Sequence, residues 1–313
     1  MIITQGVSRI VCPLLSSNHQ VVAVLESAPR NYQQRRRLHH GYGLIRSVLS
    51  VVRPCLQTLK QLCKQKKLPY RFMTGSHDEG LEDWIRAQNP DVIVVFSMSQ
   101  LLKENIFNIP KFGTINIHPS YLPEYRGPAP DIWQYYNMEI NPGVTVHYID
   151  SGEDTGDIIF QERTPILLGK KLPDKLDKLI GRTGVNLILK ALNAIQEGNA
   201  PRVTQSKESP TLRARNLKPG EYNQLINWEN WPIEHVWHVL RGTEHWLNEL
   251  HQPKGFYKCQ SWIVEDYERC DISGYKIGEV YRGAGKWFVI CKEGKIYLSL
   301  KFDLKNLLIG LIR

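Results

Sequence analysis

Hydrophobic and polar positions follow two different periods along the first 200 residues. Short runs rich in β-branched residues predict strands at Met1–Gln5, Gln20–Glu26 and Asp91–Ser97, and segments of helical length separate these runs. This alternation is typical of a parallel sheet built from βαβ units. The turn after the first run, at residues 6–9, lacks the Gly-x-Gly-x-x-Gly fingerprint of dinucleotide binding. The pattern therefore predicts a Rossmann-like α/β fold that does not bind NAD.

The pattern continues into a second group of elements. Strands are predicted at Thr114–His118, Gly143–Asp150 and Ile158–Phe160, and a long helix at Leu172–Gly198. Within the second of these strands, Val144 and Val146 alternate with Thr145 and His147, so one face is apolar and the other is polar.

The last third of the chain has a different pattern. The segment Asn199–Gly220 is rich in Pro, Arg, Lys and Ser, which is typical of a linker. Beyond it, a helix is predicted at Pro232–Leu240, and short strands at Trp262–Glu265, Ile277–Tyr281, Trp287–Cys291 and Ile296–Leu300. Such spacing closes naturally into a small β-barrel, here of the OB-like kind. We therefore expect an α/β domain at residues 1–200, a linker at 201–225 and a C-terminal β-barrel domain at 226–313.

The net charge of +9 is concentrated at the front of the chain. Residues 1–75 hold twelve Lys and Arg side chains and one acidic side chain, Glu26, so the remaining residues are slightly acidic. Clustered positive charge favours a polyanionic partner such as RNA phosphates or a nucleotide diphosphate. Within this part, Arg30–Arg46 is predicted as a mobile loop and Val51–Lys67 as an amphipathic helix.

Several classes of protein are excluded by what the sequence lacks. The six cysteines lie far apart with no Cys-x-x-Cys pair, so neither a zinc ribbon nor a disulfide framework is expected. His235 and His238 fall three apart on a predicted helix without a third ligand, so no metal site is predicted. The first residues do not resemble a secretion signal, and no stretch approaches 18 consecutive apolar residues. We expect a cytoplasmic protein with no membrane span.

The stretch Gly113–Pro130 carries most of the chemistry. Asn116 and His118 are two residues apart on a predicted strand, so they project from one face at its carboxyl end, where open α/β sheets bind ligands. The loop Asp150–Asp157 after the next strand brings Asp154 to this imidazole. No Gly-x-Ser-x-Gly elbow and no nearby cysteine offers a nucleophile. These groups suit acyl transfer in which the substrate supplies the nucleophile.

Two stretches, in order, resemble the signature of the folate-dependent formyltransferase family. They are Asn-Ile-His-Pro-Ser-Tyr-Leu-Pro with Tyr-Arg-Gly-Pro-Ala-Pro, and Gly-Val-Thr-Val-His with Asp-Thr-Gly-Asp-Ile. The resemblance covers roughly residues 1–200 and, more weakly, the C-terminal domain. It implies formyl transfer from the cosubstrate 10-formyltetrahydrofolate to a primary amine, without a metal. It also implies that Asn116, His118 and Asp154 are the catalytic set.

The resemblance extends to the residues that bind the two substrates. The folate pocket maps onto Phe96–Leu102 and Asp150–Asp154, where backbone groups mainly hold the pterin. The expected folate-binding residues are Phe96, Ser97, Met98, Ser99, Leu101, Asp150, Gly152 and Glu153. The expected acceptor-binding residues are Ser120, Arg126, Gly127, Arg35 and Arg36.

Two anionic acceptors stay open. The length, the basic linker and the basic front are similar to family members that formylate methionyl-tRNA, for which phosphate contacts supply affinity. The segment Pro130–Tyr136 is closer to members that formylate nucleotide-linked amino sugars, and the C-terminal domain is only weakly basic. We favour methionyl-tRNA. A binding protein without chemistry and a general RNA-binding protein are the non-enzymatic alternatives, and either would keep its ligand affinity in a His118→Ala variant.

Overall fold

The computed structural model describes residues 1–29, 32, 58–75, 78–170, 176–243, 249–251, 253 and 260–302. The predicted loop at Arg30–Arg46, with Arg35 and Arg36, lies outside the described residues except for Tyr32. So does the first part of the helix predicted at Val51–Lys67, whose described part contains helix α4 (Leu59–Gln65). A capping box explains where α4 begins, because Thr58 and Gln61 satisfy each other's backbone N–H groups.

Two compact units alternate along the chain. Unit 1 comprises Met1–Pro128, Gly143–Thr164 and Ile180–Arg213, and unit 2 comprises Ala129–Pro142, Pro165–Leu179 and Ala214–Arg313. The chain therefore leaves unit 1 three times and returns to it twice, and its last segment belongs to unit 2.

Unit 1 is built on a seven-stranded sheet in the order β3-β2-β1-β4-β5-β6-β7. The strands are β1 (Ile2–Thr4), β2 (Val24–Ser27), β3 (Tyr70–Met73), β4 (Ile93–Phe96), β5 (Thr114–His118), β6 (Gly143–Tyr148) and β7 (Ile158–Arg163). The first five strands are parallel, and β6 and β7 are each antiparallel to the strand before them. The order reverses between β1 and β4, which makes their carboxyl ends the topological switch point where such sheets bind ligands. The α/β fold is confirmed.

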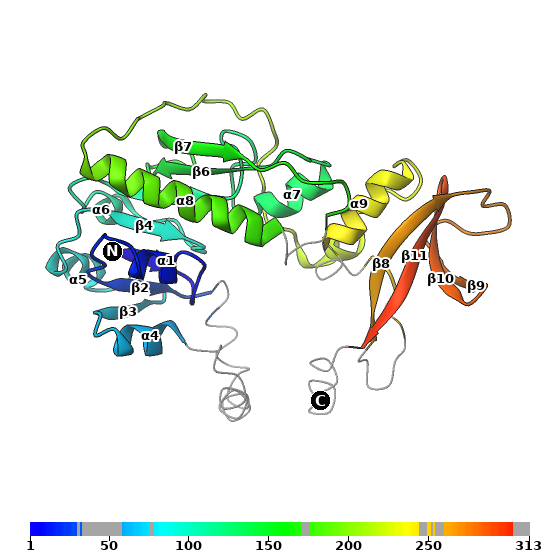
Figure 1. Cartoon of the computed structure of the whole chain (residues 1–313), viewed down its shortest axis with the longest axis horizontal. Coiled ribbons are helices and arrows are strands. Elements are labelled where there is room, and N and C mark those ends of the chain that lie inside the picture. The colour runs from blue at the N-terminus through cyan, green and yellow to red at the C-terminus, as the bar shows by residue number, and fades with distance from the viewer. Residues whose placement is uncertain are drawn as a thin grey trace. The chain divides into compact units, whose positions relative to one another are not determined.

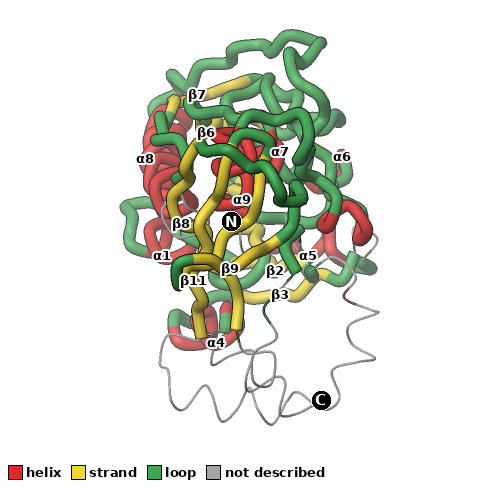
Figure 2. The backbone as a smooth tube through the Cα atoms, turned by 90° about the vertical axis from the view of Figure 1, so that its right-hand side faces the viewer, coloured by secondary structure: helices red, strands yellow, loops and turns green. Residues whose placement is uncertain are grey.

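Helices cover both faces of this sheet. They are α1 (Val11–Leu15), α5 (Leu81–Ala87), α6 (Glu104–Phe107) and the long α8 (Leu176–Gln196). Figure 2 shows α1 and α8 on one side of the strands and α5 and α6 on the other. Gly184 of α8 sits against Ile117 and Val144, 3.2 and 3.4 Å from where its own Cβ would lie. Because side chains alternate along a strand, the neighbours of Ile117 and Val144 project from the face opposite α8.

The core beneath α5 and α6 is aliphatic. Ile3, Leu25 and Ile93 have no exposed surface, and Leu81 and Ile85 of α5 pack against them. Each such side chain contributes about 1.5–3 kcal/mol by leaving water. The strand that carries Asn116 and His118 therefore belongs to a well-packed sheet.

Unit 2 combines helices with a second sheet (Figure 1), and a 3₁₀-helix at Pro219–Asn223 precedes α9. Its described helices include α7 (Pro130–Tyr136) and α9 (Ile233–Thr243), and its described strands are β8 (Gln260–Arg269), β9 (Val280–Gly283), β10 (Lys286–Cys291) and β11 (Gly294–Phe302). The four strands are antiparallel in the order β8-β11-β10-β9. The sequence predicts a closed barrel here, whereas in the described part of the chain no pairing joins the edge strands β8 and β9, so the structure shows a four-stranded sheet.

The packing of α7 and α9 depends on small residues and one histidine. The Tyr135 ring occupies the space at Gly242, where an added Cβ would lie 2.0 Å from it. His238 is fully buried, stacks on Tyr135 with 4.7 Å between ring centroids, and accepts the Gly169 N–H at Nδ1. Segments far apart in sequence are thus held together by side-chain contacts.

Candidate active site

The site begins with two residue pairs across strands β5 and β6. Asn116 lies directly opposite His147, and His118 lies opposite Thr145. All four project from the face opposite α8, and the Asn116 Nδ2 lies 3.2 Å from the His147 Nε2. His118 is 4% exposed and His147 is 2% exposed, so both imidazoles are nearly removed from water.

The loop that follows β5 is held back onto β6 by Thr145. The Thr145 hydroxyl donates to the Ser120 carbonyl at 2.8 Å and accepts the Leu122 N–H at 3.0 Å. Further along, Tyr125 has a left-handed backbone with φ of 53°, and its carbonyl lies 3.0 Å from the His118 Nε2. The loop thus fixes one nitrogen of the His118 ring through a backbone oxygen.

The loop that follows β6 carries Asp154. The Asp150 carboxylate accepts the Gly152 N–H at 3.0 Å and the Thr155 hydroxyl at 2.7 Å, which closes a tight turn. A Cβ on Gly152 would lie 2.0 Å from that hydroxyl, so the turn requires glycine there. Asp154 itself has φ of 55°, in the left-handed region that Asp tolerates better than most residues.

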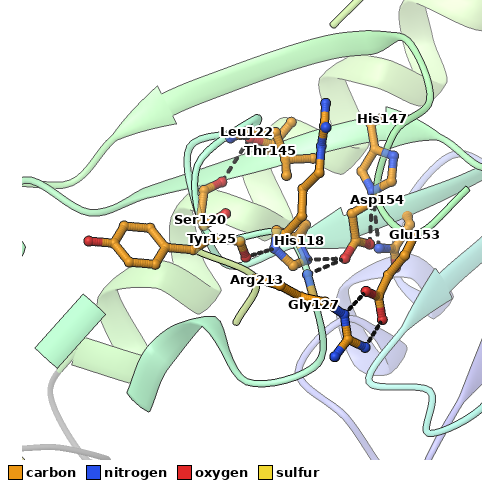
Figure 3. A network of polar contacts seen from close by, with 12 residues as sticks. His118, Ser120, Leu122, Tyr125, Gly127, Thr145, His147, Glu153, Asp154 and Arg213 are labelled. Atoms are coloured by element: carbon orange, nitrogen blue, oxygen red, sulfur yellow. Dashed lines mark hydrogen bonds and ion pairs between the residues drawn. The ribbon is translucent and has the colours of Figure 1, made fainter. Parts of the chain in front are cut away.

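The Asp154 carboxylate lies between the two imidazoles (Figure 3). Its Oδ2 is 3.6 Å from the His118 Nδ1 and accepts the Gly127 N–H at 2.9 Å, and its Oδ1 is 3.7 Å from the His147 Nε2. The structure therefore brings together Asn116, His118 and Asp154, as the sequence predicts. His118 has an oxygen acceptor facing each ring nitrogen.

His147 has a defined protonation state. Burial lowers its pKa from 6.5 to about 4, although the Asp154 carboxylate acts in the opposite direction. The ring is therefore neutral at pH 7. Because its Nδ1–H donates to the Tyr148 carbonyl at 2.8 Å, its Nε2 is left as an acceptor for the Asn116 amide. The neutral ring thus orients the Asn116 side chain.

These side chains can stabilise a developing charge and transfer protons, but none of them is a nucleophile. The Ser120 hydroxyl donates to the Glu124 carbonyl, and neither nitrogen of His118 has a serine or cysteine partner among the contacts of the described residues. In the described part of the chain, no group of three or more His, Cys, Asp or Glu side chains could hold a metal ion. Nor is any helix there long and apolar enough to span a membrane.

The predicted folate-binding residues lie at two places. Asp150, Gly152 and Glu153 are in the Asp154 loop, and Glu153 forms a bidentate ion pair with Arg213. Phe96 ends β4 at the switch point, and Ser97, Met98, Ser99 and Leu101 follow it. There the Ser99 hydroxyl donates to the Gln5 side chain beyond β1 at 2.9 Å, and Leu101 is 69% exposed.

The predicted acceptor-binding residues differ in accessibility. Ser120 is fully buried, and Gly127 donates its N–H to Asp154. Arg126 is 9% exposed, and its guanidinium donates to the Gln205 side chain and to the carbonyls of Ser206 and Lys207. Arg35 and Arg36 lie outside the described residues.

Sequence reasoning missed several residues at this site. His147 could have been found, because it alternates with Thr145 on the polar face of a strand that pairs with β5. Gln205, Thr211 and Arg213 contact the two loops from a polar segment without periodicity, which gave no such signal.

Comparison with known proteins defines the class. Residues 8–192 match the family described as formyl transferase. The match covers more than half of the chain, and the chain belongs to this family.

Curated proteins with similar sequences include methionyl-tRNA formyltransferases. The chain is 38% identical to a methionyl-tRNA formyltransferase of Clostridioides difficile (strain 630) over 156 residues, 49% of each protein. It is 30% identical to the methionyl-tRNA formyltransferase of Geobacter sulfurreducens over 249 residues, 78% of this chain and 72% of that protein. The aligned part spans only about half the length of several such relatives, 49%, 51% and 56%.

Solved structures support the fold over almost the whole chain. An N-formyltransferase from Helicobacter canadensis, in complex with folinic acid and dTDP-3-aminofucose, aligns with a TM-score of 0.61 at 17% identity, covering 96% of this chain and 98% of that one. A 4-N formyltransferase from Francisella tularensis aligns with a TM-score of 0.55 at 15% identity. At this identity the likeness shows the fold alone.

Proposed function

We propose that the protein transfers a formyl group from 10-formyltetrahydrofolate to a primary amine. The observation that carries the proposal is the Asp154 carboxylate lying between His118 and His147, with Asn116 beside them at a strand end. These residues can bind an oxyanion and move a proton, and the formyl transferase family supplies the reaction class.

The chemistry follows from the roles that these side chains can take. A neutral amine attacks the formyl carbon, the bond from that carbon to N10 of the folate breaks, and the proton lost by the amine passes to N10. Asn116 donates a hydrogen bond to the developing oxyanion, a contact worth about 10²–10³ in rate in other enzymes. His118 carries the proton, and Asp154, 3.6 Å from its Nδ1, compensates the charge while it does so.

The donor is a cosubstrate, and the residues proposed to bind it are those after β4 and in the Asp154 loop. Ser97, with φ of 56°, and Gly152, in the tight turn, are both exposed residues, and main-chain groups around them are proposed to bind the heterocycle. The relative solved with folinic acid supports a folate at this fold's site.

For the acceptor, we propose methionyl-tRNA. The curated relatives at 30–39% identity are methionyl-tRNA formyltransferases, and the basic first 75 residues suit RNA phosphates. The alternative is a nucleotide-linked amino sugar. It is supported by the fold of the Helicobacter canadensis relative, which holds dTDP-3-aminofucose and aligns over nearly the whole of both chains.

The test is release of tetrahydrofolate from 10-formyltetrahydrofolate with each acceptor in parallel. One arm contains charged initiator methionyl-tRNA, and the other contains a panel of nucleotide-linked 3- and 4-amino sugars. Turnover with tRNA alone supports the proposal, and turnover with a sugar alone replaces it by the alternative. If tetrahydrofolate is released in neither arm, the result contradicts formyl transfer to an amine.

A further inference from the structure

The segment at residues 205–213, which we call the strap, lies outside the predicted catalytic motifs but contacts both loops of the site. It follows the bridge between Val203 and Ile158 at the edge strand β7. Apolar packing of Leu212 does not hold the strap in place, because this side chain is 92% exposed. The strap is therefore held by polar contacts, and these contacts reach the residues next to His118 and Asp154.

The first contact is made by Gln205, which is 8% exposed. Its Nε2 donates to the Asp154 carbonyl at 3.1 Å and to the Gly156 carbonyl at 2.7 Å. Its Oε1 accepts two hydrogen bonds from the Arg126 guanidinium, at 2.8 and 3.3 Å. The amide thus cannot rotate without breaking bonds at both ends, and it fixes the backbone of Asp154.

The second contact is made by Thr211. Its hydroxyl accepts the Tyr125 N–H at 2.6 Å, and the neighbouring Ser209 hydroxyl donates to the Pro123 carbonyl at 2.7 Å. Tyr125 is the residue whose carbonyl faces the His118 Nε2. The strap therefore fixes the loop that orients His118.

Both contacts are made at left-handed residues. Tyr125 has φ of 53° and Asp154 has φ of 55°, and such conformations are strained for residues other than glycine, so the surroundings must hold them. Each of these residues bears on His118, one through its carbonyl and the other through its carboxylate. A third contact, the ion pair between Arg213 and Glu153, joins the end of the strap to the Asp154 loop (Figure 3).

We propose that Gln205 and Thr211 are positioning residues for formyl transfer, because they hold Asp154 and Tyr125 in the left-handed conformations that aim both loops at His118. Arg126 acts through Gln205. The kinetic test of this proposal rests on the proposed function, because it measures formyl transfer. The structural test does not, because it measures the surroundings of the His118 ring.

The test uses Gln205→Met and Thr211→Val in the full chain, with Gln88→Met and Thr58→Val as matched controls. Gln88 donates to the Trp84 carbonyl, and the Thr58 hydroxyl accepts the Gln61 N–H, so each control loses a bond of the same kind away from the site. With the acceptor that the wild type uses, we expect kcat to fall about 10- to 100-fold in the strap variants. In Thr211→Val, which acts on the loop after β5, the KM for 10-formyltetrahydrofolate should stay within about twofold, because that loop orients His118 and is not proposed to bind the folate.

A second readout needs no acceptor. The ring ¹⁵N resonances of His118 and His147 should shift in Gln205→Met and Thr211→Val, and stay at their wild-type positions in both controls. Unchanged ring resonances, or a kcat loss no larger than that of the controls, would overturn the proposal. If the wild type turns over neither acceptor, the function fails while the resonances still decide the role of the strap. If Gln205→Met does not fold, Thr211→Val carries the same test.

Discussion

At the scale of single residues, the hydrogen bond between His147 and Asn116 decides how the amide is presented. The neutral His147 ring accepts from Asn116 through Nε2, and burial keeps it neutral. An Asn side chain held by such a bond keeps one orientation, so its other N–H can face a developing oxyanion.

We therefore expect His147→Leu to lower kcat about 10-fold or more, because it removes the acceptor that orients Asn116. His147→Gln should lose less, since its side-chain oxygen can accept the same N–H. Steady-state kinetics of tetrahydrofolate release measures both. The matched control is His19→Leu, which breaks another His–Asn pair of unit 1, between His19 and Asn193, away from the site. Equal losses in the Leu and Gln variants would contradict the orienting role.

The sequence could predict the motif residues because they lie on or next to regular elements. Asn116 and His118 share the face of a strand that was predicted with the bounds it has, and Asp154 follows the next strand. The contacts of Gln205 and Thr211 span 49 to 86 residues of sequence and come from a segment with no period. Such contacts follow only from the folded path of the chain.

At the scale of elements, α9 depends on a histidine that must stay neutral. Burial lowers the pKa of His238 from 6.5 to about 4, and its Nδ1 accepts the Gly169 N–H. Protonation would place a hydrogen on that nitrogen and break the bond. Between pH 6.5 and 4 the unfolded chain binds more protons than the folded one, so the stability of unit 2 falls as the pH falls.

His238→Asn should remove this pH dependence. Its side-chain oxygen can still accept the Gly169 N–H, but it does not titrate in this range. The variant therefore has a lower free energy of unfolding at every pH, because packing is lost. It also lacks the slope of that free energy, up to about 1.4 kcal/mol per pH unit, that binding of one proton gives. Urea unfolding between pH 4 and 7, with wild type and variant side by side, measures it. An identical slope in both proteins would show that another group titrates.

Helix α9 also depends on the absence of a side chain at Gly242. Alanine is favoured over glycine inside a helix by about 1 kcal/mol, but here its Cβ would lie 2.0 Å from the Tyr135 ring. Overpacking costs about 1–3 kcal/mol or more, so we expect Gly242→Ala to be destabilising. Gly220→Ala is the control, because no atom lies within 4 Å of its added Cβ. Thermal unfolding of the two variants gives the answer, and equal midpoints would refute the packing argument.

The elements that sequence periodicity missed are short. β3, α1, α5 and α6 span four to seven residues each, too few for a period to emerge. The strands β8–β11 were predicted from their β-branched and aromatic runs, but their closure into a barrel depends on edge pairing, which no local pattern encodes.

At the scale of the whole molecule, the positive charge concentrated in the first 75 residues predicts a different salt dependence of KM for each of the two acceptors. If the basic first 75 residues neutralise about five phosphates of a tRNA, raising NaCl from about 50 to about 200 mM should raise the acceptor KM about 100-fold or more. A nucleotide diphosphate carries about two charges, so its KM should rise about tenfold or less. Replacing Arg35 and Arg36 by Gln should reduce the salt slope by about 1 for each phosphate that an arginine no longer neutralises. An unchanged slope would exclude both arginines from binding.

The interleaving of the two units has a consequence for how the chain folds during synthesis. Tyr135 leaves the ribosome about a hundred residues before Gly242, which at about 5–20 residues per second is roughly 5–20 seconds earlier. Throughout that interval α7 has no α9 to pack against, although the strands of unit 1 on either side of it can already pair. Unit 2 must therefore be completed last, when α9 packs against segments of the same unit that were synthesised earlier.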